Sequence, residues 1–354
     1  MSGGGAARLN AAWLSEVLGA TVTDVVWRPV GTGQMSGCFR GELTGEGVPA
    51  RLVAKLPAAD RAAREMLKGI YRTEVRFYLD LASTVAVRTP ACPYGTLSED
   101  ATDFVLLLED LHPGAQGDQL AGCTAGEALD CVVNLAGLHG PRWCDPTLLD
   151  LDWLHRTGPE DGDGVTGALG PATEIFIDRF ADRLAAEDKA TLRAVALQAG
   201  PWITARPERF SLVHGDYRLD NIIFAAGGGP GVAAVDWQTL TVGLPARDLA
   251  YFLGTGLTVA DRRTHERDLV TAYHRALAGH GVTGYSLEQC WDDYAFAFLQ
   301  GPLITVLGCA YGSPTERGDE MFLTMAARSC TAIRDHGSLG KVPSGVPYGT
   351  SETG

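Results

Sequence analysis

The chain has 354 residues, of which 45% are hydrophobic, so it can bury a large core and fits two lobes of one catalytic unit better than one small domain. Its formal net charge of −14 argues against a nucleic-acid partner, because binding to a phosphate backbone requires a basic face. We expect a cytoplasmic protein with no membrane partner. No run of about 18 uncharged apolar residues exists to span a bilayer, and residues 1–5 lack the basic start and apolar core of a signal peptide.

The eight cysteines are scattered, without a C-x-x-C pair or a matching histidine spacing, and therefore predict no zinc site. Cys131 and Cys309 lie in apolar segments and are interpreted as small, reduced core residues, which agrees with a reducing compartment. The negative charge permits a cationic substrate, but a soluble surface kept away from zero charge is the simpler interpretation.

The N-terminal part is predicted to be rich in β-strands. Residues 22–30, 38–43 and 50–56 have the composition of short strands separated by glycine-containing turns, so we expect them to form a meander. Residues 61–82 have apolar side chains at helical spacing, and residues 104–108 form a continuous apolar run typical of a buried strand.

A glycine-containing turn joins the first two predicted strands. Glycine lets the backbone approach a ligand closely, and the N–H groups of such a turn can contact phosphates. Gly31, Gly33 and Ser36 are therefore candidate nucleotide-binding residues. The turn is not the G-x-G-x-x-G of protein kinases, and a glycine-rich hairpin without a ligand is the alternative.

Lys55 ends the third predicted strand and is one of only four lysines in a chain that otherwise uses arginine. In a kinase, a lysine at this place pairs with the α- and β-phosphates of the nucleotide and is held by a carboxylate from a helix. Glu74, in the predicted helix that follows, is the candidate for that carboxylate, and Glu65 is its competitor. An ordinary surface lysine followed by a helical glutamate is the alternative interpretation.

Glu109, Asp110 and Leu111 directly follow the predicted buried strand and are expected to form a hinge between two lobes. Backbone groups at Glu109 and Leu111 would meet the purine edge of a nucleotide, although a simple strand end is the alternative. We therefore expect a nucleotide-binding lobe over residues 1–111 and a helical lobe, with the catalytic loop and the acceptor site, over residues 112–337.

Helical signals dominate the second lobe. Capping boxes at 124–127 and 286–289 predict helix starts, and residues 320–335 are predicted as a last helix closed by a glycine. The acidic stretch 144–164 is interpreted as a solvated loop, with an acceptor pocket for a cationic substrate as the alternative. Residues 338–354 are rich in Gly, Pro, Ser and Thr and are predicted to be a flexible tail.

The strongest functional signal is formed by Asp216, Asn221 and Asp236. An Asp five residues before an Asn, followed by a second Asp at the end of a β-like run, is the arrangement by which kinases place a catalytic carboxylate and two Mg²⁺ ligands. Asp216 is the candidate catalytic residue, which aligns the acceptor hydroxyl for in-line attack. Asn221 and Asp236 are the candidate metal ligands. Turn formation alone does not require this spacing.

Two histidines and a further aspartate accompany this motif. His214 is a second candidate catalytic residue, with structural support of the loop as the alternative. His139 is interpreted as a hydrogen-bonded core residue, and Asp248 is predicted to cap a helix or to tie down the catalytic loop.

Together these motifs resemble those of the aminoglycoside phosphotransferase and choline kinase superfamily, with the closest likeness to its ecdysteroid-kinase-like branch. The resemblance covers nearly everything from residue 30 to residue 334. It rests on the segments 106–111, 138–139, 214–221, 235–238 and 247–251.

The resemblance implies an α+β, protein-kinase-like fold with two lobes, a β-rich N-terminal lobe and a mainly helical C-terminal lobe. It also implies that ATP or GTP binds between the lobes with Mg²⁺ and gives its γ-phosphoryl group to a hydroxyl of a small-molecule alcohol. Asp236-Trp237-Gln238 departs from the D-F-G of protein kinases. Asp248 follows Asp236 by only twelve residues, which leaves little room for an activation segment and disfavours protein substrates.

The Arg-, Ala- and Gly-rich composition resembles that of high-GC bacteria, in which such enzymes often inactivate antibiotics or modify secondary metabolites. The expected acceptor is therefore an antibiotic or another secondary metabolite, namely a sugar, a nucleoside or a sterol-like alcohol, and a role in resistance is one interpretation. A nucleotide-binding pseudoenzyme that acts as a regulatory module is the alternative, which the complete set of polar residues disfavours. The choice between ATP and GTP, the oligomeric state and the acceptor itself stay open.

Overall fold

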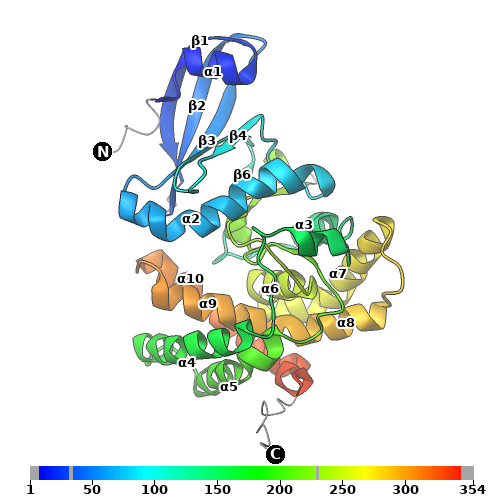
Figure 1. Cartoon of the computed structure of the whole chain (residues 1–354). Coiled ribbons are helices and arrows are strands. Elements are labelled where there is room, and N and C mark those ends of the chain that lie inside the picture. Colours follow the sequence, from blue (N-terminus) through cyan, green and yellow to red (C-terminus); the bar gives the residue numbers. More distant parts are fainter. Residues whose placement is uncertain (1–7, 32–34, 229–230, 344–354) are drawn as a thin grey trace, which may run out of the picture.

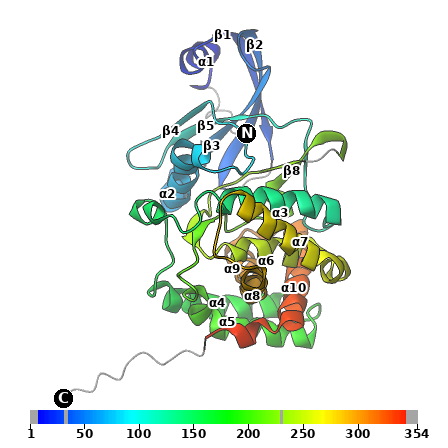
Figure 2. The same cartoon turned by 90° about the vertical axis from the view of Figure 1, so that its right-hand side faces the viewer.

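The structure is a computed structural model that describes residues 8–31, 35–228 and 231–343. A β-sheet flanked by helices forms the upper part of the molecule in Figure 1, and a larger group of helices forms the lower part. Figure 2 shows the same division from the side, with α3 and α7 directly beneath the sheet region. This arrangement of a β-rich N-terminal part and a mainly helical C-terminal part is the predicted α+β architecture.

The N-terminal part contains a five-stranded antiparallel sheet in the order β1-β2-β3-β5-β4. Its elements are α1 (Ala11–Leu18), β1 (Thr21–Val30), β2 (Ser36–Glu46), β3 (Arg51–Pro57), α2 (Arg61–Arg76), β4 (Tyr94–Leu97) and β5 (Phe104–Glu109). The predicted meander is confirmed, since β1, β2 and β3 are successive neighbours. Helix α1 was not predicted.

Strand β3 divides its side chains between the two faces of this sheet. Leu52, Ala54 and Leu56 join Leu14 of α1 in a hydrophobic cluster on one face. Side chains alternate along a strand, so Lys55 lies on the opposite face, where it meets the helical part. The sheet thus buries an apolar face under α1 and turns a charged group toward the second part.

Helix α2 begins where Oδ1 of Asp60 accepts a hydrogen bond from the N–H of Ala63 at 2.8 Å. The helix predicted over 61–82 is confirmed as far as Arg76, after which the chain makes a wider π turn (Phe77–Leu81) and a short 3-10 turn (Ala82–Thr84). Phe77 stacks against Trp237 of the helical part, with ring centroids 3.7 Å apart. The irregular end of α2 is therefore a contact between the two parts.

The C-terminal part is built from helices and two small sheets, with the strand orders β10-β7 and β6-β8-β9. Its helices are α3 (Ala125–His139), α4 (Asp161–Arg179), α5 (Ala186–Ile203), α6 (Ala246–Gly256), α7 (Val259–Gly279), α8 (Leu287–Phe296), α9 (Gln300–Tyr311) and α10 (Glu316–His336). Its strands are β6 (Ala115–Gln116), β7 (Ser211–Val213), β8 (Ile222–Phe224), β9 (Val232–Ala234) and β10 (Thr241–Gly243).

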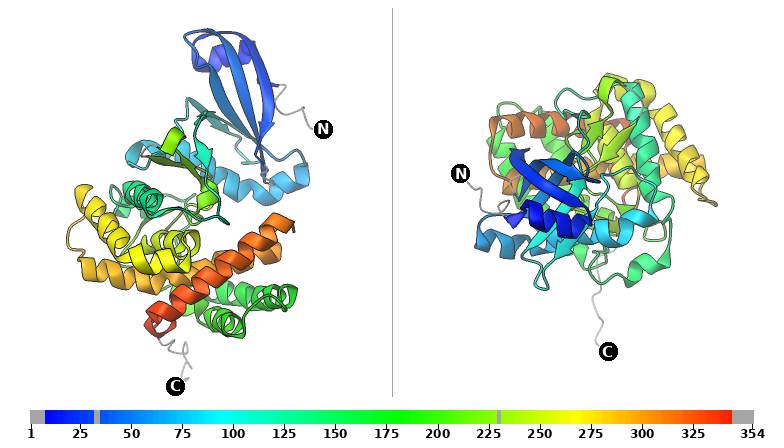
Figure 3. Two further views of the ribbon diagram at one scale, coloured as in Figure 1. Left: turned by 180° about the vertical axis from the view of Figure 1, so that it is seen from behind. Right: turned by 90° about the horizontal axis from the view of Figure 1, so that it is seen from above.

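The helix boundaries follow the predicted capping signals. Thr124 and Glu127 form a reciprocal capping box at the start of α3, and Ser286 and Gln289 form a second one at the start of α8. Gly337 ends α10 in the left-handed conformation, with a φ of +59°. Seen from behind in Figure 3, α10 runs diagonally beside α4 and α5.

The acidic stretch 144–164 contains a 3-10 turn (Pro146–Asp150) and the start of α4. Asp150, Asp152, Glu160 and Asp163 are all exposed. Their exposure agrees with the interpretation of this stretch as solvated.

Two predictions about the C-terminal part were wrong. Ser338–Lys341 forms a 3-10 helix in which Ser338 is buried and Lys341 lies 2.6 Å from Asp292, so the ordered chain continues past the predicted start of the tail; residues 344–354 lie outside the described residues. The second wrong prediction is that the chain has no apolar run long enough to span a membrane. One helical stretch, Leu287–Tyr311, is long and apolar enough by length and composition to do so. Its most apolar window is 72% buried inside the protein, which is typical of a core helix.

Candidate active site

Helix α6 holds the loop that carries Asp216. Asp248, in the first turn of α6, is fully buried, and its two carboxylate oxygens accept hydrogen bonds from the backbone N–H groups of His214 at 2.6 Å and Gly215 at 2.9 Å. Gly215 has a φ of +82°, and a Cβ there would lie 2.6 Å from the carbonyl oxygen of Thr239, so the loop requires glycine. The prediction that Asp248 ties down this loop is confirmed.

His139 supports Asp248 from within the core. It is fully buried, its Nε2 lies 3.2 Å from Oδ2 of Asp248, and its Nδ1 lies 2.7 Å from the hydroxyl of Tyr273. The prediction of His139 as a hydrogen-bonded core residue is confirmed.

The structure does not place His214 for catalysis. Its ring is buried, Nδ1 accepts the backbone N–H of Asp216 at 3.3 Å, and Nε2 lies 3.1 Å from the carbonyl oxygen of Val235. Because Nδ1 accepts a hydrogen bond, Nε2 carries the proton and donates a hydrogen bond to the carbonyl oxygen of Val235. Neither nitrogen is therefore free to take a proton from a substrate. His214 joins the Asp216 loop to the segment that precedes Asp236, which corrects its inclusion among the catalytic candidates.

Three side-chain donors surround the carboxylate of Asp216. The hydroxyl of Tyr251 donates to Oδ1 at 2.8 Å, Nδ2 of Asn221 donates to Oδ2 at 2.9 Å, and Nε of Arg218 lies 3.1 Å from both oxygens. The side chain of Asp216 is still 23% exposed. The donors therefore hold the carboxylate in one orientation while part of it stays open to another molecule.

Asn221 and Asp236 lie side by side because they flank two paired strands. Asn221 precedes β8, Asp236 follows β9, and the N–H of Val235 donates to the carbonyl oxygen of Asn221 at 3.0 Å. The Nδ2 group of Asn221 is committed to Asp216, which leaves its carboxamide oxygen for another ligand. Asp236 has a φ of +68°, a conformation that is uncommon outside glycine and recurs at functional sites.

The chemistry of these two residues fits Mg²⁺. This ion prefers oxygen ligands and usually takes one or two carboxylates from a protein together with phosphate oxygens and water. Among the described residues, no group of three or more His, Cys, Asp and Glu side chains could hold a metal. A site made of Asn221 and Asp236 would therefore depend on the phosphates of a nucleotide, and the two residues stay predicted ligands.

Lys55 connects the two parts of the molecule. Its Nζ lies 2.6 Å from Oε1 of Glu74 and 3.2 Å from Oδ1 of Asp236. Burial by itself lowers the pKa of Lys55, but Glu74 and Asp236 outweigh this effect, so the pKa lies above its ordinary value and the ammonium group stays charged. Glu65 is exposed and lies 4.0 Å from Lys68, so Glu74 is the partner of Lys55.

Trp237 and Gln238 fasten this centre, and sequence reasoning missed both roles. Trp237 is fully buried and donates its Nε1 hydrogen to Oγ1 of Thr89 at 3.0 Å. Gln238 donates to Oε2 of Glu74 at 3.3 Å, so both oxygens of that carboxylate are held. The sequence feature that could have indicated these roles is the departure from D-F-G. A tryptophan and a glutamine at these positions need hydrogen-bond partners of their own.

The predicted phosphate-binding turn is only partly described, since Gly33 lies outside the described residues. Gly31 has a φ of +75°, which favours glycine, and Ser36 is buried at the start of β2. The hydroxyl of Tyr71 in α2 donates to the carbonyl oxygen of Met35 at 2.7 Å and so fixes the end of the turn. Gly31, Gly33 and Ser36 stay predicted nucleotide contacts.

The segment predicted to be a hinge, residues 109–111, offers fewer free backbone groups than expected. The N–H of Glu109 donates to the carbonyl oxygen of Ala91 at 2.8 Å, so this N–H is not available to a purine. The carbonyl oxygen of Leu111 accepts the N–H of Gly114 at 2.8 Å. For Leu111, the N–H is therefore the group left to meet a nucleotide base.

Asp110, between these two residues, ties the segment to the sheet. Its carboxylate is almost fully buried and lies 2.9 Å from Nε of Arg40 in β2 and 3.3 Å from Nε of Arg51 in β3. It also accepts the backbone N–H of His112 at 3.1 Å. These ion pairs were not predicted, because their members are far apart in the sequence.

Comparison with solved structures places this geometry in a known fold. A choline kinase from Cryptosporidium parvum Iowa II is 9% identical, with a TM-score of 0.60 and coverage of 90% of this chain and 92% of that chain. An ethanolamine kinase of Plasmodium vivax is 11% identical, with a TM-score of 0.56 and coverage of 88% and 84%. The GDP complex of aminoglycoside 2'-phosphotransferase-IIIa is 14% identical, with a TM-score of 0.53 and coverage of 90% and 96%.

These likenesses show a protein-kinase-like, two-lobed fold. Residues 36–286, more than half of the chain, match the Phosphotransferase enzyme family, and the chain belongs to that family. The predicted membership of the aminoglycoside phosphotransferase and choline kinase superfamily is confirmed; the ecdysteroid-kinase-like branch stays a hypothesis.

Curated relatives match only a short segment. Acyl-CoA dehydrogenase family member 10 of Mus musculus is 48% identical over 46 residues, which are 13% of this chain and 4% of that protein. Acyl-CoA dehydrogenase family member 11 of Homo sapiens is 48% identical over 42 residues, 12% of this chain and 5% of that protein. The match thus spans about one twentieth of the length of these relatives.

Proposed function

We propose that this enzyme transfers the γ-phosphoryl group of ATP or GTP, with Mg²⁺, to a hydroxyl group of a small molecule. The observation that carries the proposal is a chain of three contacts. Asn221 donates to Asp216, Val235 next to Asp236 donates to the carbonyl oxygen of Asn221, and Asp236 pairs with Lys55. These contacts join a carboxylate that can meet an alcohol to a buried cation that can meet phosphates. The solved GDP complex of an aminoglycoside phosphotransferase with the same fold is further support for a nucleotide.

Each residue has a defined task in this proposal. Asp216 orients the acceptor hydroxyl and takes its proton as the new bond forms between the acceptor oxygen and the γ-phosphorus and the bond to the β,γ-bridging oxygen breaks. Lys55 neutralises charge on the phosphates, and Glu74 keeps it in place. Mg²⁺, held by Asn221 and Asp236, would supply further positive charge at the β- and γ-phosphates.

The proposed acceptor is an antibiotic or another secondary metabolite, namely a sugar, a nucleoside or a sterol-like alcohol. The enzymes with the same fold are named for small alcohols, aminoglycosides among them, which supports a small acceptor and leaves resistance as one biological role. The short β10 and the start of α6 fill the segment after Asp236, which supports the exclusion of an extended peptide.

We further propose a cytoplasmic location. All eight cysteines are free thiols in the structure, which supports a reducing compartment.

The proposal predicts that Asp216→Ala nearly abolishes transfer. We expect kcat to fall by about a thousandfold, because the acceptor hydroxyl loses the group that aligns it and takes its proton. The dissociation constant of Mg²⁺-ATP should be nearly unchanged, since Lys55, Asn221 and Asp236 are intact. Asp182→Ala, an exposed aspartate between α4 and α5, is the matched control and should keep wild-type turnover.

The measurement is release or transfer of ³²P from γ-labelled ATP and GTP, with water and a panel of sugar, nucleoside and sterol alcohols as acceptors. Unchanged turnover in Asp216→Ala contradicts the proposed mechanism. A wild-type protein that binds nucleotide but shows no transfer and no hydrolysis with Mg²⁺ supports the pseudoenzyme alternative instead.

A further inference from the structure

We infer that Tyr251 is a positioning residue for phosphoryl transfer, whose hydroxyl fixes the orientation of the Asp216 carboxylate. The inference rests on the proposed function, because it requires Asp216 to meet the acceptor alcohol. The contact itself is direct, since the hydroxyl of Tyr251 donates to Oδ1 of Asp216 at 2.8 Å. The two residues are 35 positions apart and belong to different elements.

One face of α6 supports the whole loop. Residues 248, 251 and 255 follow helical spacing and therefore share a face. Asp248 holds the backbone at the start of the loop, and Tyr251 holds the Asp216 side chain in the middle. Thr255 accepts a hydrogen bond at Oγ1 from Gln119, whose own Oε1 accepts the N–H of Leu219 near the end of the loop.

Counting hydrogen-bond positions shows what Tyr251 adds. A carboxylate offers about four lone-pair sites. Asn221, Arg218 and Tyr251 occupy about three of them, which leaves one for the acceptor hydroxyl. Without Tyr251, Oδ1 keeps only the shared contact with Arg218, and the carboxylate can rotate between two arrangements.

Tyr251 is also the donor with no competing partner among the described residues. Asn221 donates at 2.9 Å to the carbonyl oxygen of Asp216 as well as to its side chain, and Arg218 is shared with Asp220 at 2.9 Å and with the sulfur of Met321 at 3.0 Å. The Tyr251 hydroxyl donates to Asp216 alone. The hydrogen bond from Tyr251 therefore depends only on the position of the Asp216 carboxylate.

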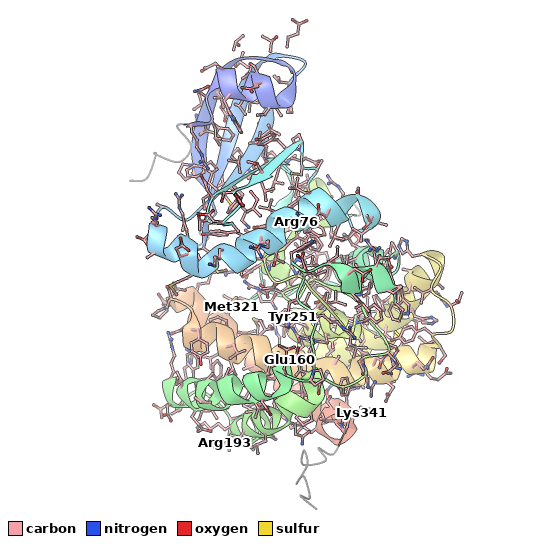
Figure 4. All side chains as sticks on the ribbon, in the orientation of Figure 1. Arg76, Glu160, Arg193, Tyr251, Met321 and Lys341 are labelled. Carbon is pink, nitrogen blue, oxygen red and sulfur yellow. The ribbon has the colours of Figure 1, made fainter. Side chains whose placement is uncertain are left out.

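The surroundings keep the Tyr251 ring in place. Tyr251 is fully buried and forms a separate hydrophobic cluster with Met321 and Met325 of α10. Figure 4 shows Tyr251 and Met321 close together in the helical part, beneath α2. Burial, the larger cause, and the negative charge of Asp216, the smaller cause, raise the pKa of Tyr251 well above its ordinary value. The phenol therefore keeps its proton and stays a hydrogen-bond donor.

The test compares Tyr251→Phe with Tyr294→Phe. Tyr294 is also fully buried and donates to a carboxylate, Oε2 of Glu266 at 2.9 Å, but it lies in α8. Both variants lose one hydrogen bond from a buried tyrosine to a carboxylate, so the melting temperatures of both should fall. Only Tyr251→Phe should lower kcat, by about tenfold, with the KM and dissociation constant of Mg²⁺-ATP unchanged.

Turnover is measured with γ-labelled ATP, using water and the best alcohol of the panel as acceptors. We expect transfer to the alcohol to fall more than hydrolysis, because an alcohol must be aligned and water is small and mobile. In an Asp216→Ala background, Tyr251→Phe should have no further effect, because Tyr251 acts only through Asp216.

The outcomes separate the two claims. Wild-type kcat in Tyr251→Phe, with an inactive Asp216→Ala variant, overturns the role of Tyr251 and leaves the proposed function intact. An equal loss of kcat in Tyr294→Phe, or a further loss in the Asp216→Ala background, also overturns that role. Full turnover in Asp216→Ala, or none in the wild type, overturns the proposed function and this inference with it.

Discussion

Lys55 is a buried ammonium group whose charge depends on two carboxylates. Glu74 is 1% exposed and lies 2.6 Å away, whereas Asp236 is 38% exposed and lies 3.2 Å away. Breaking a buried ion pair by removing one partner is costly, because the remaining charge is left without compensation. Glu74 is therefore the more important partner for the position of Lys55 before a nucleotide binds.

This argument predicts the behaviour of Glu74→Gln. The free energy of unfolding should fall by about 3 kcal/mol, the lower end for a broken buried pair, since Asp236 still pairs with Lys55. The KM for the nucleotide should rise roughly tenfold, because Lys55 loses the charge that holds it. Chemical denaturation and steady-state kinetics measure the two quantities.

Glu65→Gln is the matched control for this prediction. Glu65 lies on the same helix, α2, and its side chain is 53% exposed. The Glu65→Gln variant should have the wild-type free energy of unfolding and the wild-type KM for the nucleotide. Equal effects at the two positions would show that Glu74 has no special relation to the nucleotide.

At the scale of elements, α10 is anchored to α7 by an ion-pair cluster. Asp335 of α10 binds Arg262 and Arg263 of α7, and Arg262 also lies 2.7 Å from Glu266. A hydrogen bond from Arg263, and to a lesser extent one from Arg262, holds the pKa of Asp335 at about 2, below its ordinary value of 3.8. Because α10 also carries Met321 beside Tyr251, this anchor contributes to the surroundings of the site.

The cluster predicts a pH-dependent effect of Asp335→Asn. A carboxyl group whose pKa is lowered by folding stabilises the folded state above its ordinary pKa, and this contribution disappears as the pH falls through the lowered value. The melting temperature of Asp335→Asn should therefore be several degrees below that of the wild type at pH 7, with the difference shrinking between pH 3.8 and about 2.

Thermal melts across this pH range measure the difference. Asp268→Asn, an exposed aspartate on α7, is the control and should match the wild type throughout. A difference in melting temperature that stays constant down to pH 2 would contradict the role of the Asp335 charge.

The sequence predicted those features of the fold and the site that depend on residues close together in the chain. The capping boxes at Thr124 and Ser286 and the glycine that ends α10 are such cases, as is the spacing of Asp216, Asn221 and Asp236. The π turn after Arg76 was missed because it depends on the packing of Phe77 against Trp237, which is distant in sequence.

The supporting residues of the site were beyond the reach of spacing arguments. Tyr251, Gln238 and Arg40 act through partners that only the fold brings near them. The error over His214 has the same cause, because both of its ring nitrogens are taken by backbone groups, one of them from Val235. The uncharged stretch in Leu287–Tyr311 was overlooked, and only its burial identifies it as part of the core.

For the whole molecule, the decisive feature is that the two parts share one site. Lys55 and Glu74 come from the β-rich part, whereas Asp216, Asn221 and Asp236 come from the helical part. The contact between Lys55 and Asp236 joins residues 181 positions apart. A nucleotide placed here would bind both parts at once and should therefore stabilise their relative arrangement.

A crystal structure of the protein with Mg²⁺ and a non-hydrolysable ATP or GTP analogue tests the central claim most directly. The account predicts a metal ion about 2.1 Å from the carboxamide oxygen of Asn221 and from a carboxylate oxygen of Asp236. It also predicts that Lys55 contacts the α- or β-phosphate and that the γ-phosphate faces the exposed edge of Asp216. A nucleotide bound elsewhere, or a metal ion that contacts neither Asn221 nor Asp236, would contradict it.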